Sequence, residues 1–315
     1  MNWPTLLGLV CLTASLVTSR PTFSQQSAND KATATAAVVN GQSISVNTVH
    51  HFLDRSFRNL PNLANRADRA ADVVQAGIEH CINREVILQH LQSGKFKTSD
   101  QEIDRQLEEF EAQLKRTGST LEKHLEEIQL TTEELRRERL WQTSWRKYAQ
   151  KFVTIEHLKK QFEQKRKYFD GTKLHVAQIL LKDNRDETVE KAREILKELE
   201  TKKLSWNDAV KAHSESASAK NKGDLGWIDY SGPMPRTFTQ QAFELEAGEF
   251  SQPFTSKYGV HVVRCIEVVD GTKTFDDVAQ ELRDVETNRL FQLVSQRHRP
   301  KAKIETPDLD ARPAR

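Results

Sequence analysis

The chain has 315 residues, of which 37% are apolar and 29% are charged, and a length of this order fits about two domains. Its 47 lysines and arginines nearly balance its 45 acidic residues, which argues against a nucleic-acid binder that depends on bulk positive charge. Three cysteines are too few for a disulfide scaffold or a four-cysteine zinc site. The small number of glycines, 12, indicates a helix-rich protein.

The first predicted element is an export signal. Residues 6–17 form a short apolar run, which is well below the length of about 20 residues that a membrane span requires. Small residues follow the run, so we expect cleavage after about Ser19 or Ser24 and assign 1–24 to a signal peptide. No lysine or arginine precedes the run, which leaves an uncleaved signal anchor or a disordered start as the alternative. Residues 25–36 are polar and predict a linker.

Residues 37–170 predict a domain of amphipathic helices. Apolar side chains recur there at helical spacing, and one of these stripes is aromatic (Trp141, Trp145, Tyr148, Phe152). Ser99, Ser119 and Thr131 are each followed three positions later by glutamate, the pattern of a capping box at a helix start. Because these starts interrupt the register, separate helices with core-facing stripes are favoured over one continuous coiled coil.

The cysteines and the paired histidines of the mature chain indicate structural roles. Cys81 lies on an apolar helical stripe and Cys265 interrupts an apolar strand. Buried free thiols are therefore favoured, and a disulfide between distant domains is the alternative. His50 and His51 lack a second ligand pair at metal-binding spacing, so we expect no metal site.

Residues 173–269 change in character and predict a compact α+β domain. Residues 174–181 are typical of a strand, 187–201 of a helix, and a further helix is expected to begin after Ser205. A short helix through Phe238 and a strand that starts after Tyr258 and Gly259 complete the pattern.

Five segments of this domain resemble parvulin-type peptidyl-prolyl isomerases in order and spacing. They are QILL at 178–181, SES at 214–216, AKNKGDLGW at 219–227, M-x3-F-x4-F at 234–243 and PF-x4-GVH at 253–261. The combination of the GDLGW element with the later G-x-H strand start makes this resemblance specific.

The resemblance implies which side chains would form the active site. Leu225, Met234 and Phe238 would line the pocket for the proline ring, and His261 would be one of two active-site histidines. The residues by themselves leave ordinary core packing open for Met234 and Phe238. They also leave a structural, hydrogen-bonded histidine open for His261.

At two catalytic positions the chain departs from the family pattern. Gln178 stands in place of the second histidine, and Ser216 in place of the Asp or Cys near the substrate carbonyl. Glutamine still offers a donor and an acceptor, but it cannot titrate. His175 is no simple replacement, because strand alternation points it to the opposite face from Gln178.

A second, outer resemblance concerns the helices. The segment VVNGQSI at 38–44, followed by helices, resembles the start of SurA/PrsA-type chaperones, in which an isomerase domain is inserted in a helical chaperone module. This implies an α+β fold in which the helix at 274–295 returns to the chaperone domain. Residues 296–315 contain three prolines and predict a disordered tail.

These features together predict an exported parvulin-type peptidyl-prolyl isomerase that assists the folding of translocated or envelope proteins. Rotation about an X–Pro bond breaks no bond, so the catalyst needs an apolar seat and suitable polar groups, not a nucleophile. We expect unfolded or newly exported proline-containing polypeptides as partners, the periplasm or cell envelope as location, and neither cofactor nor nucleic acid.

Two other functions stay open from the sequence. The first is a non-catalytic periplasmic holdase chaperone with a degenerate parvulin domain, which Gln178 and Ser216 favour. The second is a structural helical adaptor, which would give no reason for the pocket residues.

Overall fold

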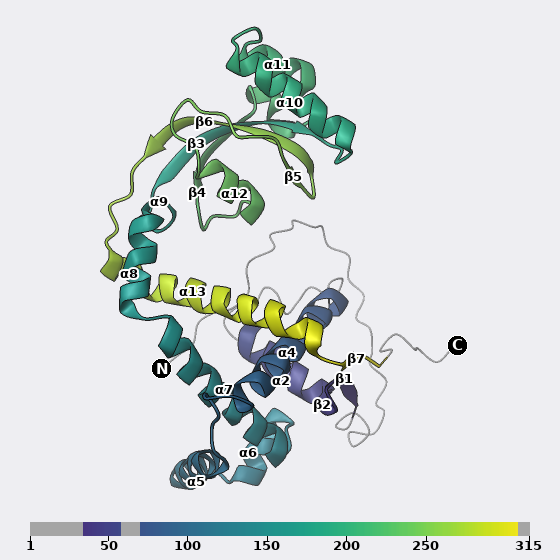
Figure 1. Cartoon of the computed structure of the whole chain (residues 1–315), viewed down its shortest axis with the longest axis vertical. Coiled ribbons are helices and arrows are strands. Elements are labelled where there is room, and N and C mark those ends of the chain that lie inside the picture. The colour runs from purple at the N-terminus through teal and green to yellow at the C-terminus, as the bar shows by residue number, and fades with distance from the viewer. Residues whose placement is uncertain (1–33, 58–69, 308–315) are drawn as a thin grey trace, which may run out of the picture. The chain divides into compact units, whose positions relative to one another are not determined.

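The computed structural model describes residues 34–57 and 70–307 (Figure 1). The predicted signal peptide, 1–24, and all but the end of the predicted linker lie outside the described residues. The described chain divides into two compact units, a helical unit of 34–57, 70–154 and 284–307, and an α+β unit of 155–283. Among the helices that the structure describes, none combines the length and the apolar character needed to cross a bilayer.

The helical unit is built from amphipathic helices whose starts follow capping chemistry. Its helices are α2 (Val46–Phe57), α4 (Ala70–Gln92), α5 (Asp100–Arg116), α6 (Leu121–Ile128), α7 (Thr132–Phe152) and the C-terminal part of α13 (Phe275–His298). Ser99 caps α5 and Thr131 forms a complete capping box on α7, as predicted. The prediction for α6 is wrong by one residue, because Thr120 rather than Ser119 accepts the backbone N–H of Lys123.

A small antiparallel sheet accompanies these helices. Asn40 and Gly41 have φ angles of 49° and 85° and join β1 (Thr35–Val39) to β2 (Gln42–Ser45) through a two-residue turn. On its other side β1 pairs with β7 (Ile304–Glu305), so the strand order is β2-β1-β7.

The prediction of a disordered tail over 296–315 is wrong for the part that the structure describes. Helix α13 continues to His298, and a 3-10 turn, η3 (Arg299–Lys301), leads into β7. Lys303 exchanges hydrogen bonds with Asn40: its N–H donates to Oδ1 (2.7 Å) and its carbonyl accepts the Asn40 N–H (2.8 Å). These pairings join residues more than 250 positions apart, so local composition did not reveal them.

Helix α13 returns to the helical unit, as the predicted fold class required. Phe291 packs edge-on against Trp141 (6.0 Å between ring centroids) and Trp145 (5.7 Å) of α7, and it stacks on His80 of α4 (4.9 Å). The aromatic stripe of α7 is buried at its start, but Phe152 at its end is 46% exposed. The stripe is therefore only partly core.

The α+β unit places helices on both faces of a four-stranded antiparallel sheet (Figure 1). The sheet order is β4-β3-β6-β5, with β3 (Lys173–Leu181), β4 (Asp224–Asp229), β5 (Phe254–Ser256) and β6 (Gly259–Val269). The helices are α8 (Ile155–Gln164), α9 (Arg166–Phe169), α10 (Asp186–Glu200), α11 (Trp206–His213), the 3-10 helix η2 (Ala217–Asn221) and α12 (Arg236–Ala242). Apart from small shifts at their ends, the predicted strands and helices of this unit are confirmed, as is the α+β class.

Alternation along β3 separates two apolar clusters. Ala177 and Ile179 belong to the cluster under α10 and α11, whereas Leu174 and Val176 belong to the cluster under α12. Cys265 lies in the second of these clusters. Cys265 and Cys81 are both buried and free, which confirms the prediction of buried thiols over a disulfide.

Candidate active site

Four polar side chains meet on the α12 face of the sheet. Gln178 lies in the middle of β3, His261 near the start of β6, Ser256 at the end of β5, and Ser216 caps η2. The register pairs Leu180 with His261, which makes Gln178 and His261 diagonal neighbours on one face. The structure thus brings the three predicted polar positions together and adds Ser256, which the sequence reasoning missed.

These four side chains form one continuous chain of hydrogen bonds, here called the Ser256–Ser216 chain. Oε1 of Gln178 lies 2.9 Å from Nδ1 of His261, and because a carboxamide oxygen only accepts, Nδ1 is the donor. Nε2 of His261 then accepts from the hydroxyl of Ser256 at 2.6 Å. At the other end, Nε2 of Gln178 donates to Oγ of Ser216 at 3.2 Å. Both ring nitrogens of His261 are therefore satisfied in its neutral form.

The four side chains of the Ser256–Ser216 chain carry no net charge at neutral pH. His261 is 4% exposed and Gln178 is 8% exposed. Burial lowers the pKa of His261 from 6.5 to about 4, because a charged imidazole loses hydration in the protein interior. The imidazole is consequently an uncharged donor and acceptor at pH 7.

An apolar surface borders the imidazole. Phe254 stacks on His261 with ring centroids 5.1 Å apart and planes 10° apart. The buried ring of Phe238 meets His261 edge-on at 5.8 Å. Leu225 and Met234 are partly buried against the same cluster. The predicted proline-pocket residues thus share one cluster beside the Ser256–Ser216 chain.

Two members of the site escaped the sequence reasoning although a signal was present. Phe254 is the cross-strand partner of His261, and Ser256 pairs with Gly259 across the turn between β5 and β6. The motif at 253–261 leaves only two residues between β5 and β6, a spacing that fits a hairpin. A hairpin in this register puts Phe254 beside the histidine and folds Ser256 back over it.

A glycine allows Ser216 to reach Gln178. Gly223 has a φ of +79°, and a Cβ at this position would lie 2.4 Å from the carbonyl oxygen of Gln178. The backbone N–H of Gln178 donates to the carbonyl of Gly223 at 2.9 Å. The loop after η2 can therefore approach β3 closely only with glycine here, and this approach positions Ser216.

His175 takes no part in the Ser256–Ser216 chain. Its Nε2 lies 2.8 Å from Oδ1 of Asp224, and its ring is 5.3 Å from that of Trp227. It belongs to a separate pair on β3 and β4 and does not replace the missing histidine, as strand alternation predicted.

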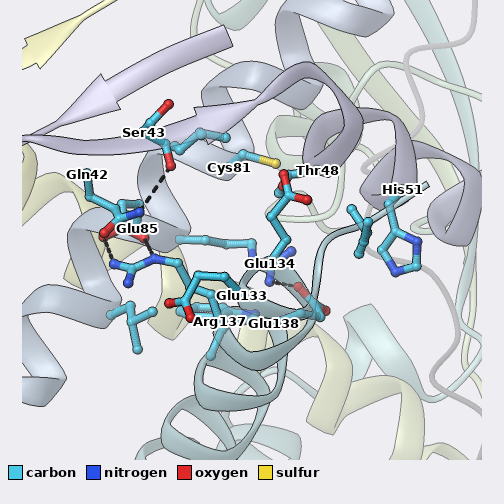
Figure 2. A pocket seen from close by; sticks show the side chains of 15 residues that line it. Gln42, Ser43, Thr48, His51, Cys81, Glu85, Glu133, Glu134, Arg137 and Glu138 are labelled. Carbon is cyan, nitrogen blue, oxygen red and sulfur yellow. Dashed lines mark hydrogen bonds and ion pairs between the residues drawn. The ribbon is translucent and has the colours of Figure 1, made fainter. Parts of the chain in front are cut away.

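The helical unit has a small cavity of its own, between β2, α2, α4 and α7 (Figure 2). Its volume is about 80 Å³. The walls combine apolar side chains with a group of charged residues (Arg84, Glu85, Glu133, Glu134, Arg137, Glu138). This space is large enough for a few water molecules but not for a peptide.

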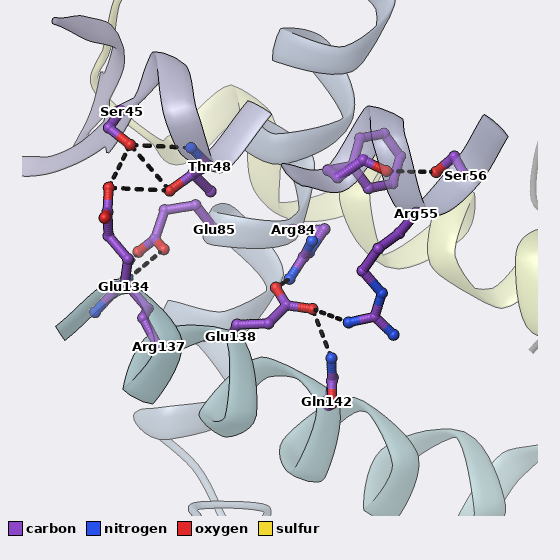
Figure 3. A network of polar contacts seen from close by, with 11 residues as sticks. Ser45, Thr48, Arg55, Ser56, Arg84, Glu85, Glu134, Arg137, Glu138 and Gln142 are labelled. Atoms are coloured by element: carbon purple, nitrogen blue, oxygen red, sulfur yellow. Dashed lines mark hydrogen bonds and ion pairs between the residues drawn. The ribbon is translucent and has the colours of Figure 1, made fainter. Parts of the chain in front are cut away.

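Four charged residues of that wall form two ion pairs, Arg84 with Glu138 and Arg137 with Glu85 (Figure 3). Glu138 accepts from Arg84 and, at 2.6 Å, from Gln142. Burial by itself would raise the pKa of Glu138, but the Arg84 guanidinium outweighs it and lowers this pKa to about 2. Arg137 donates from Nε to Glu85 at 2.8 Å.

Glu134 is engaged in the same way. It accepts from Ser45 and from Thr48 across the unit, and it also completes the capping box of α7. With their acceptors already occupied, these carboxylates serve to hold α2, α4 and α7 together.

Two family models match the chain. The model of the PPIC-type PPIASE domain matches residues 175–267, and the model of the SurA-like N-terminal domain matches residues 2–149. The two matches fall on opposite sides of the break between the N-terminal helices and the α+β unit.

Among individual proteins, the chain is similar to foldases. It is 31% identical over 224 residues to the foldase protein PrsA of Bacillus subtilis. The aligned region covers 69% of this chain and 70% of the relative. It is 28% identical over 211 residues to the foldase protein PrsA of Geobacillus kaustophilus, with 66% and 69% covered. The crystal structure of a peptidylprolyl isomerase (PrsA) from Bacillus anthracis is 23% identical and covers 70% of this chain and 95% of its own, with a TM-score of 0.38.

Proposed function

This chain belongs to the PrsA foldase family of parvulin-type peptidyl-prolyl isomerases with a SurA-like N-terminal domain, and we propose that it isomerises X–Pro bonds with the side chains around His261. The observation that carries this assignment of residues is the neutral Ser256–Ser216 chain beside an apolar cluster. Leu225, Met234 and Phe238 seat the proline ring in this proposal.

The apolar cluster accounts for part of the catalysis. The barrier to rotation, about 18–20 kcal/mol, arises because the twisted amide loses resonance. A planar amide has a strongly polarised carbonyl, whereas the twisted amide is less polarised. A surface of Phe238, Phe254 and Met234 that excludes water therefore disfavours the planar form relative to the transition state.

The polar chain accounts for the other part. The nitrogen of the twisted amide gains lone-pair character and becomes a better acceptor, so a preorganised neutral donor stabilises it. We assign this task to the hydroxyl of Ser256, which donates to Nε2 of His261 in the free protein and turns from that nitrogen to the amide nitrogen of the bound substrate. Gln178 and Ser216 position the imidazole and fix its tautomer, because Gln178 Oε1 accepts from Nδ1. No nucleophile is required, since no covalent bond breaks.

We further propose a division of labour along the chain. Residues 173–269 isomerise, while 37–170, together with the helix at 274–295, hold unfolded segments of the substrate. Unfolded or newly exported polypeptides in the periplasm or cell envelope are the substrates in this proposal. The foldase relatives and the short apolar run at 6–17 support it. Sequencing of the mature N-terminus tests the export step, which predicts a start after about Ser19 or Ser24.

A proline-limited refolding assay tests the isomerase assignment. The wild-type chain should accelerate refolding in proportion to its concentration. Met234→Ala should reduce that acceleration roughly fivefold, because truncating a half-buried methionine removes about 1 kcal/mol of apolar contact. Val269→Ala, which truncates a 48% exposed side chain at the opposite end of β6 from His261, is the matched control and should change nothing. If the wild-type protein suppresses aggregation but never accelerates refolding, the isomerase assignment is wrong and the holdase function takes its place.

A further inference from the structure

A second cavity lies on the opposite face of the sheet from the Ser256–Ser216 chain. Arg264, which lines it, is the cross-strand partner of Ala177, and Ala177 belongs to the cluster under α10 and α11. The cavity has a volume of about 360 Å³, within the usual size of ligand sites. Its polar wall comes from four elements and consists of Asn207, Asn221, Lys222, Asp224 and Arg264.

Arg264 has a donor that no protein group satisfies. Its Nε is buried and lacks a hydrogen-bond partner, and it is the one side-chain nitrogen or oxygen in this state among the described residues. The guanidinium lies 6.0 Å from the centre of the Phe250 ring, which offers no acceptor oxygen. Since an unpaired buried donor is unfavourable, the guanidinium is poised to turn toward an acceptor that enters the cavity.

The rest of the wall favours an acceptor with negative charge. Lys222 is exposed and adds a second positive charge, and the amides of Asn207 and Asn221 add donors. The single carboxylate in the wall is that of Asp224. Its Oδ1 already accepts from His175 (2.8 Å) and from the backbone N–H of Gly226 (2.7 Å). Donors and positive charge therefore dominate, and the planar fork of an arginine fits a carboxylate.

We propose that this cavity binds the carboxylate of an acidic residue in a polypeptide. Trp206 and the 39% exposed Ile266 line the same cavity, so they supply an apolar contact for the residue beside the acidic one. The choice of a polypeptide over another oxyanion rests on the proposed function, because the substrates of this enzyme are polypeptides. The cavity would be a peptide site separate from the proline site.

Titration calorimetry on the full mature chain tests the proposal. The probe is an acetylated, amidated, proline-free peptide with two glutamates among leucines, compared with the same peptide carrying glutamines. The glutamate peptide should bind at least tenfold more tightly. Because the indole N–H of Trp206 donates to the carbonyl of Lys222 (2.9 Å), its NMR signal should shift on binding.

Three variants locate the site. Arg264→Gln should remove the preference for the glutamate peptide, and Arg264→Lys should keep only a small part of it, because lysine lacks the fork. Lys222→Asn should weaken binding about threefold; asparagine is chosen because Lys222 has a φ of 55°, which asparagine tolerates. Lys191→Gln, an exposed lysine of α10 outside the cavity wall, is the control and should bind like the wild type.

The outcomes separate this site from the proposed function. Equal binding of the two peptides, or a preference that survives Arg264→Gln in a folded protein, overturns the carboxylate site. If inorganic phosphate competes for the cavity as well as the glutamate peptide does, the ligand is not specifically a polypeptide. The cavity is then a general oxyanion site. A wild-type chain without isomerase activity contradicts the proposed function alone, because the binding probe contains no proline. Arg264→Gln should isomerise a neutral proline peptide at the wild-type rate.

Discussion

Two buried polar networks, one in each unit, handle charge in opposite ways. In the helical unit Glu138 keeps its charge in the interior, paired with Arg84. In the α+β unit the Ser256–Ser216 chain is uncharged from end to end. Opposite charges fix the orientation of packed helices at a high desolvation cost. The neutral Ser256–Ser216 chain, which lies beside the apolar cluster, instead provides hydrogen bonds without a charge. A charge there would keep water bound in the site.

The pKa values of the two regions show the same contrast. At Glu138 an arginine overrides burial and lowers the pKa to about 2, whereas at His261 burial acts unopposed and lowers the pKa to about 4. Both shifts move the pKa down, but one keeps a charge and the other removes one. A charged pair suits a structural joint, and a neutral imidazole suits a site that acts on an uncharged amide.

The largest expected effect comes from breaking the charged pair. Arg84→Met leaves the Glu138 carboxylate buried with Gln142 and only the longer, more exposed contact to Arg55 (3.5 Å), and it should lower the free energy of unfolding of the helical unit by about 3–5 kcal/mol. Urea denaturation followed by tryptophan fluorescence measures this. The double variant Arg84→Met/Glu138→Leu should recover most of the loss. The control is Arg105→Met, whose ion pair with Glu109 is 71% exposed on both sides and should cost less than about 0.5 kcal/mol. A similar small loss for Arg84→Met would contradict a structural role of the pair.

The second prediction concerns acid. The unfolded chain protonates His261 near pH 6.5, but the folded chain does so only near pH 4. The unfolded state therefore binds the proton first, and the stability contributed by His261 is complete above pH 6.5 and is lost as the pH falls toward 4. The full loss is about 3 kcal/mol.

The comparison of unfolding free energies of the wild type and His261→Asn across pH 7 to 4 isolates this term. The difference between the two proteins should change with pH, because His80 and the carboxylates contribute equally to both. An NMR titration in which the imidazole of His261 protonates near pH 6.5 would contradict the neutral chain.

A third substitution makes the neutral site resemble the charged one. Gln178→Glu puts a carboxylate against Nδ1 of His261 and should raise the pKa of that imidazole by one unit or more, which is at least about 1.4 kcal/mol. We expect the isomerase rate to fall at neutral pH, since the site then carries charge. Gln113→Glu, at an exposed position of α5, makes the same change in net charge and should leave His261 unaltered. An NMR titration of the imidazole measures the pKa of His261 in both variants. An unchanged pKa of His261 in Gln178→Glu would show that the two side chains are not hydrogen-bonded.

The smallest effect is expected at Ser256, which is one end of the Ser256–Ser216 chain. Ser256→Ala removes the donor to Nε2 of His261 and should cost about 1 kcal/mol of stability, the net value of one hydrogen bond. The imidazole also becomes freer to rotate, so the isomerase rate should fall while peptide affinity stays the same. Ser231→Ala, which removes an exposed hydroxyl with its 3.2 Å bond to Glu281, is the control. Indistinguishable rates for the two variants would remove Ser256 from the site.

Local sequence signals explain why most helices and strands could be predicted. Thr131 with Glu134 marked a helix start because the capping chemistry is contained within four residues. The same logic failed by one residue at Ser119, because the neighbouring Thr120 offers an equivalent hydroxyl. Asn40 and Gly41 form a dipeptide that is a strong local signal for a hairpin turn, and the structure has this turn between β1 and β2.

The composition of the active site could be predicted only in part. Gln178, Ser216 and His261 were singled out by their positions in a family pattern, and the structure brings them into one hydrogen-bonded chain. Phe254 and Ser256 were missed because their importance depends on the register of a hairpin, which composition does not specify.

The sequence by itself determined the class of the protein, the order of its elements and the presence of side chains without charge at positions 178 and 216, because patterning and residue chemistry are local properties. Only the tertiary structure decided which groups are desolvated together. Four features depend on residues that are far apart in the chain. They are the burial of His261, the ion pair of Glu138 with Arg84, the unpaired donor of Arg264 and the pairing of β7 with β1. A pKa or a hydrogen bond at such a place depends on what surrounds the group in space, and no local pattern records those surroundings.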